Sequence, residues 1–129
     1  MGGGMGDMPK DDGPAPRFDL TERTACFGEN VIEFCLAVRL NAITSPLVSQ
    51  LVRAAGSVGA NYSEADESAT RKEFRYRISL CKREAKESKH WLRLLAAAAP
   101  DKKEAARKLW KEAHELTLIF ATIFRNSQD

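Results

Sequence analysis

Apolar residues recur every three or four positions in four stretches of the chain: residues 20–41, 46–65, 71–98 and 102–125. This spacing places them on one stripe of an α-helix, which turns once in about 3.6 residues. The third stretch is the most regular, and its apolar seam consists of Phe74, Ile78, Cys81, Ala85, Ser88, Leu92 and Leu95. No strand-like alternation competes with this period. The pattern therefore predicts four amphipathic helices.

Breaks of only a few residues separate the four stretches. Ser45 is expected to cap the second helix, because Pro46 then falls at a first helical position, where its missing amide costs nothing. Thr70 and Glu73 form a capping box at the start of the third helix, and Pro100 ends that helix. Loops this short cannot run the length of a bundle, so consecutive helices are expected to be antiparallel.

The predicted fold class is therefore all-α, an antiparallel up-down-up-down four-helix bundle in a single domain at residues 19–127. Asp101 and Glu104 repeat the capping-box pattern at the start of the fourth helix. Residues 1–18 are rich in glycine and proline, a composition that buries too little apolar surface to offset the entropy of ordering. We expect them to form a disordered N-terminal arm.

Composition narrows the function only slightly. The 129 residues are enough for one domain with its own core, and a net charge of +2 is too small to imply a polyanionic partner. Cys26, Cys35 and Cys81 lie within the apolar periodic runs, which favours buried thiols in a reducing compartment. No apolar run approaches the roughly 20 residues of a membrane span. We expect a cytoplasmic location without membrane contact.

Catalytic chemistry is not indicated. Glu87 and His90 match the Glu-x-x-His spacing of di-iron bundles, but both project away from the apolar seam. On the fourth helix Lys111 stands three places before His114, where a second copy of that motif needs glutamate. No nucleophile lies beside a suitable base. We therefore expect no enzyme activity, no metal site and no cofactor.

Charge is concentrated on the third helix, where residues 71–93 hold nine basic and three acidic side chains. Six of the basic residues follow helical spacing and form what we call the basic ridge: Arg71, Arg75, Lys82, Lys86, Lys89 and Arg93. Two interpretations are open. The ridge is either a solubilising surface or a contact surface for the phosphates of RNA or DNA, which would bind without reading the bases.

The second helix contains residues that are unusual in a helix. Gly56 and Gly59 each cost about 1 kcal/mol relative to alanine, and Asn61 places an amide on the apolar seam. The small residues would let another helix approach closely, either within the bundle or from a neighbouring subunit. Asn61 would either fix the register by bonding across the seam or bond a nearby backbone carbonyl or water.

Several segments together resemble one known family. They are Gln50-Leu51-Val52-Arg53, Ser57-Val58-Gly59-Ala60-Asn61-Tyr62 with Glu64-Ala65, Glu84-Ala85-Lys86-Glu87 and Trp91-Leu92-Arg93-Leu94-Leu95. The chain resembles the four-helix-bundle proteins encoded in intervening sequences of bacterial 23S ribosomal RNA genes. The resemblance implies an antiparallel bundle that forms a ring-shaped homopentamer and has no established enzyme activity. Arg53 and Tyr62, within the matching segments, join Gly56, Gly59 and Asn61 as candidates for packing or oligomer contacts.

Relatives of that family in diversity-generating retroelements are accessory proteins that contact a reverse transcriptase and nucleic acid. The leading expectation is thus a non-enzymatic, oligomeric scaffold that binds RNA or DNA non-specifically through the basic ridge. The alternative is an accessory subunit that docks a protein, such as a reverse transcriptase or a ribonucleoprotein, without touching nucleic acid itself.

Overall fold

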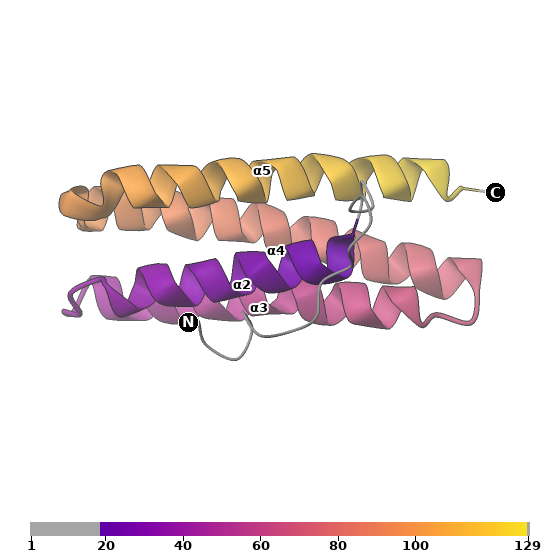
Figure 1. Ribbon diagram of the computed structural model, residues 1–129, viewed down its shortest axis with the longest axis horizontal. Coiled ribbons are helices and arrows are strands. Elements are labelled where there is room, and N and C mark those ends of the chain that lie inside the picture. Colours follow the sequence, from indigo (N-terminus) through magenta and orange to yellow (C-terminus); the bar gives the residue numbers. More distant parts are fainter. Residues whose placement is uncertain (1–18, 129) are drawn as a thin grey trace, which may run out of the picture.

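The computed structural model describes residues 19–128, so the expected arm at residues 1–18 lies outside the described part of the chain. The described residues form α-helices and one 3-10 turn, without a strand: α2 (Leu20–Leu36), α3 (Thr44–Asp66), α4 (Arg71–Ala98), η1 (Pro100–Lys102) and α5 (Lys103–Asn126). Each α-helix runs back alongside the one before it (Figure 1). The predicted all-α, four-helix arrangement is confirmed.

The helix α4 makes the most extensive helix–helix contacts in the bundle. It packs along both α3 and α5, whereas α2, the shortest α-helix, packs mainly on α3 and touches α5 less. All four α-helices contribute fully buried side chains to one core, among them Phe27, Leu51, Ile78, Leu92 and Phe120. Burying each such side chain stabilises the fold by about 1.5–3 kcal/mol. Within residues 19–128, none of the helices is long and apolar enough to span a membrane.

The first helix is shorter than expected, because it ends at Leu36 and not at Asn41. Two side chains build the turn that follows. Asn41 Oδ1 accepts hydrogen bonds from the amides of Ile43 and Thr44 at 2.8 and 2.9 Å. The buried Thr44 hydroxyl donates to the carbonyl of Arg39 at 2.7 Å. The helix α3 consequently begins at Thr44, and the prediction that Ser45 would cap it is wrong.

Of the caps predicted for α4 and α5, the first is formed and the second is not. Thr70 Oγ1 accepts from the amide of Glu73 at 3.1 Å, which confirms the predicted cap of α4. At α5 the predicted Asp101–Glu104 box is not formed. The turn η1 precedes α5 there, and the N-cap of α5 is Lys102, whose side chain makes no capping bond. Backbone hydrogen bonds of the 3-10 turn satisfy amides at this helix start that a capping side chain would otherwise bond.

Two of the three cysteines are core residues, as expected. Burial raises the pKa of Cys35 to about 11 and that of Cys81 to about 12, because the charged thiolate is disfavoured away from water. Cys26 is exposed, so the expectation of a third buried thiol is wrong. Its position on α2 falls outside the stripe that faces the core.

Candidate nucleic-acid interface

Four of the six residues of the basic ridge are exposed to solvent. Lys82, Lys86 and Arg93 are exposed on α4, and none of them makes an ion pair with any residue in the range 19–128. Their spacing places them on one side of the helix. These three cations are available to an anionic ligand.

Two residues of the basic ridge, Arg75 and Lys89, are held against the protein. The guanidinium of Arg75 lies 4.1 Å from the centroid of the Phe124 ring, and its Nε is buried without a hydrogen-bond partner. Lys89 Nζ donates to His114 Nδ1 at 3.0 Å and lies 5.1 Å from the centroid of Trp110. Because an ammonium can only donate, His114 must accept at Nδ1. Both contacts turn the ridge toward α5.

The sixth member, Arg71, is exposed at the first residue of α4. It lies about 33 Å along the helix axis from Arg93, given a rise of about 1.5 Å per residue. The basic ridge therefore runs over most of the length of α4.

Sequence reasoning missed the contribution of α5. A groove of about 720 Å³ lies between the end of α4 and the start of α5, and Arg93 lines it together with Lys103, Arg107 and Lys111 of α5. Of these α5 cations only Arg107 has an ion-pair partner among residues 19–128, Glu104 at 3.3 Å. The signal was present in the sequence as four-residue spacing, which puts all three on one side of a helix.

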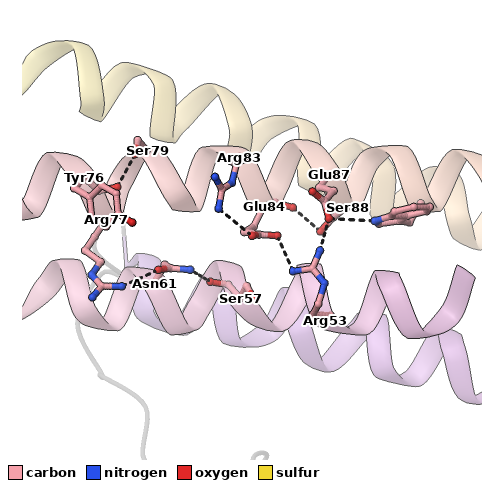
Figure 2. Close-up of polar contacts among 11 residues, drawn as sticks. Arg53, Ser57, Asn61, Tyr76, Arg77, Ser79, Arg83, Glu84, Glu87 and Ser88 are labelled. Carbon is pink, nitrogen blue, oxygen red and sulfur yellow. Dashed lines mark hydrogen bonds and ion pairs between the residues drawn. The ribbon is translucent and has the colours of Figure 1, made fainter. Parts of the chain in front are cut away.

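The acidic residues of α4 face the other neighbour, α3. Arg53 of α3 forms ion pairs with Glu84, at 3.5 Å, and with Glu87 (Figure 2). Trp91 Nε1 also donates to Glu87 at 3.4 Å. The Glu84 carboxylate is nearly buried, and a second guanidinium, that of Arg83, lies 3.9 Å away. Basic and acidic side chains thus pair across the contact between α3 and α4. On the side of α4 toward α5, the exposed cations of α4 have no such carboxylate partner among residues 19–128.

Two of the three acidic residues of α5 pair with α2. Arg23 of α2 contacts Glu112 and Glu115, with its Nε and NH2 atoms each 2.8 Å from a carboxylate oxygen. The hydrogen bond to Glu112, above all, raises the pKa of Arg23. These contacts tie α2 to α5, two helices that otherwise touch much less than α3 and α4 or α4 and α5 do. They also keep both carboxylates paired with α2 and not with the cations of α4.

The two glycines of α3 differ in their surroundings. A Cβ atom at Gly59 would lie 3.3 Å from Thr24 Oγ1, so α2 approaches α3 closely at this position. A Cβ at Gly56 would meet no atom within 4 Å. Close packing inside the bundle therefore explains Gly59 but not Gly56.

Asn61 combines both expected roles. Its Nδ2 donates to the backbone carbonyl of Ser57 at 2.9 Å, and its Oδ1 accepts from Arg77 of α4 at 3.3 Å (Figure 2). Tyr62, the next residue, is half-buried with its ring centroid 6.2 Å from that of Phe120. Burial raises the pKa of this phenol. Asn61 and Tyr62 therefore connect α3 to α4 and α5.

No group of three metal-ligating side chains comes together within residues 19–128. His90 is exposed, and Glu87 is engaged with Arg53 and Trp91. The exposed cations on α4 and α5 are suited to holding an anion.

Comparison with known proteins gives the family. The family model described as 23S rRNA-intervening sequence protein matches residues 22–122. The chain belongs to this family. The match spans all four α-helices, and the resemblance carried by the segments around Arg53, Asn61 and Trp91 is thereby confirmed.

One solved structure has a fold similar to that of this chain. It is the crystal structure of a protein with unknown function from the S23 ribosomal protein family of Bacteroides thetaiotaomicron. It is 20% identical, has a TM-score of 0.72, and the similarity covers 81% of this chain and 97% of that one. Among curated proteins, none matches the chain.

Proposed function

We propose that this family member is a non-enzymatic, oligomeric helical bundle of the bacterial cytoplasm that binds RNA or DNA without sequence specificity. The observation that carries the proposal is the set of exposed cations without ion-pair partners among the described residues, on α4 and the neighbouring start of α5: Lys82, Lys86, Arg93, Lys103 and Lys111. Phosphates are the ligands that such a surface fits, because they carry regularly spaced negative charge.

The like charges on this surface repel one another. Like charges at four-residue spacing cost a few tenths of a kcal/mol per pair, roughly 0.2–0.5. The basic ridge contains such pairs, and the carboxylates that could relieve them, Glu84 and Glu87, are paired with Arg53 instead. Because this repulsion between cations remains, the surface is well suited to an anionic partner, which would reduce it. The contacts would be to the backbone, since base reading needs side chains that reach base edges.

The test is a fluorescence-anisotropy titration of a labelled 20-nucleotide RNA and a DNA duplex with the full chain. The double variant Lys82→Glu with Lys86→Glu should bind at least about tenfold more weakly at low salt, because each reversal removes a phosphate contact and adds repulsion. The control is Lys72→Glu with Lys108→Glu, which makes the same change in net charge at exposed positions outside the ridge. Equal affinities of the two double variants would contradict the proposal.

A second candidate is a protein-docking scaffold, for example an accessory subunit of a reverse transcriptase. The observation that favours it is an apolar hollow of about 600 Å³ beside the start of α2, lined by Leu20, Tyr62, Leu118, Ile119 and Ile123 among others. Leu118 is 53% exposed there. If neither nucleic acid binds at low salt, the scaffold function is favoured over nucleic-acid binding.

A further inference from the structure

The groove between α4 and α5 has an aromatic wall as well as basic residues. It lies at the end of the bundle where α4 turns back into α5 (Figure 1), and Ala96, Ala97 and Ala106 leave it with little side-chain bulk. Its volume of about 720 Å³ is within the roughly 300–1,000 Å³ of sites that hold small organic ligands. Trp110 of α5 lines the groove and is half-buried. Contacts to phosphates leave this apolar part of the groove unexplained.

One face of the Trp110 indole is turned toward the groove. The other face is stacked on His114, with ring centroids 5.2 Å apart and planes 12° from parallel. His114 follows Trp110 on α5, whereas the groove residues Lys103 and Arg107 precede it. Lys89, whose Nζ lies 5.1 Å from the indole centroid, bonds His114 and does not line the groove. The indole is therefore held from one side and presents the opposite face to a ligand.

The groove is lined by cations and by no carboxylate. The four cations are Arg93, Lys103, Arg107 and Lys111. The three on α5 follow one another at intervals of four residues, about 6 Å along the helix axis. Of the four, only Arg107 has an ion-pair partner among residues 19–128, Glu104 at 3.3 Å. An anionic chain can therefore run along the groove beside an aromatic surface.

We propose that the groove holds a base of a single-stranded nucleic acid, stacked on Trp110 while neighbouring phosphates contact Lys103 and Lys111. This inference rests on the proposed function and names its substrate class, a single strand. In a duplex the bases stack on one another inside the helix and cannot reach the indole. Every base has a flat π face, so stacking tolerates any sequence. Stacking does not use the 2′-hydroxyl, so RNA and DNA strands are expected to bind alike.

The charge beyond the groove favours a polynucleotide over a small amphipathic anion. From Arg93 the exposed cations continue along α4 to Lys86 and Lys82, the last about 16 Å away along the helix axis. A single anionic headgroup would engage only the cations of the groove. A strand with one base on Trp110 can place its further phosphates along α4.

The experiment measures the fluorescence anisotropy of three labelled probes with the full chain at low salt. They are oligothymidylate, a strand of equal length made of abasic sites, and a DNA duplex. The wild type should bind oligothymidylate at least about fivefold more tightly than the abasic strand, because stacking one base changes affinity about five- to 150-fold. Trp110→Ala should abolish this difference and leave the affinities for the abasic strand and the duplex unchanged. Oligouridylate should behave as oligothymidylate does.

The matched control is at the other tryptophan. Trp91 is also half-buried, but it donates to Glu87 and does not line the groove. Trp91→Ala should therefore keep the wild-type preference for a strand with bases. Trp110→Phe retains an aromatic face and should keep part of that preference, which a loss of packing alone would not explain.

A second measurement does not depend on how well Trp110→Ala folds. The chain has two tryptophans, so in the variant Trp91→Phe all tryptophan fluorescence comes from Trp110. Oligothymidylate should quench this fluorescence, because a stacked base contacts the indole directly. The abasic strand should leave it unchanged.

Failure of the inference and failure of the proposed function give different results. If the wild type binds the abasic strand as tightly as oligothymidylate, and neither strand quenches Trp110, the groove holds no base although nucleic-acid binding stands. If none of the probes binds at low salt, both are overturned. Trp110→Ala should also keep the wild-type dependence of affinity on salt, since it removes no phosphate contact. A weaker salt dependence in this variant would overturn the assignment of Trp110 to a base.

Discussion

The two helices that pack on α4 treat its charges in opposite ways. On the α3 side, Arg53 pairs with Glu84 and Glu87, and Arg77 bonds Asn61. On the α5 side, Lys82, Lys86 and Arg93 have no carboxylate partner in the described chain, and α5 adds further cations beside them. One side uses its polar groups to hold helices together. The other leaves these three cations exposed to solvent.

The basic residues of α4 have different surroundings although they share one helix. Nine basic residues in one segment suggest a single electrostatic surface, but their partners divide them into structural and available groups. Lys89 and Arg75 belong to neither group fully, since both lie over aromatic rings of α5. Such a cation keeps its charge near the surface while its position is fixed by packing.

The largest expected effect is on the close contacts of α3. Replacing Gly59 with leucine forces a side chain toward α2, where even a Cβ atom would lie only 3.3 Å from Thr24 Oγ1. Overpacking of this kind costs roughly 1–3 kcal/mol. Urea denaturation followed by circular dichroism should show the loss. If Gly59→Leu is as stable as the wild type, α2 and α3 are not closely packed there.

A smaller loss of stability is expected from Arg53→Ala. The substitution leaves the nearly buried Glu84 carboxylate without its cation on α3, at a cost of about 1–2 kcal/mol. The matched variant on the other side is Lys82→Ala, whose stability should stay within about 0.5 kcal/mol of the wild type. Their nucleic-acid affinities should rank the other way, with Lys82→Ala the weaker binder. Equal losses of stability would erase the distinction between the two sides.

The smallest expected effect is a gain. A Cβ at Gly56 meets no atom within 4 Å, so Gly56→Ala should stabilise the protein by about 0.5–1 kcal/mol through helix propensity alone. Thermal denaturation at fixed protein concentration would measure it. A destabilised Gly56→Ala protein whose sedimenting mass also falls would instead place Gly56 in a contact between subunits.

Much of the fold could be predicted from the sequence because helical periodicity is a local signal. The seam through Ile78, Cys81 and Leu92 and the cap at Thr70 depend on neighbouring residues, and both appear in the structure. The end of α2 could not be predicted in this way. Its apolar pattern continues past Leu36, and the turn depends on bonds made by Asn41 and Thr44.

The candidate interface could be predicted only in part. Spacing identified the basic ridge, but it could not tell which cations are engaged, because that depends on where Phe124 and His114 of α5 fall. The cations Lys103 and Lys111 join Arg93 only because the turn at Pro100 brings α5 back along α4. Tertiary placement, not local pattern, assembled that part of the surface.

If the α5 side of α4 binds phosphates, as proposed, the affinity for nucleic acid must depend steeply on salt concentration. With about five to six phosphate contacts, the logarithm of the association constant should fall against the logarithm of salt concentration with a slope of roughly −4 to −5. The variant Lys82→Ala should reduce that slope by about 1, while Arg53→Ala should leave it unchanged. A slope near zero for the wild type, or equal slopes for all three proteins, would contradict phosphate binding by the α5 side of α4.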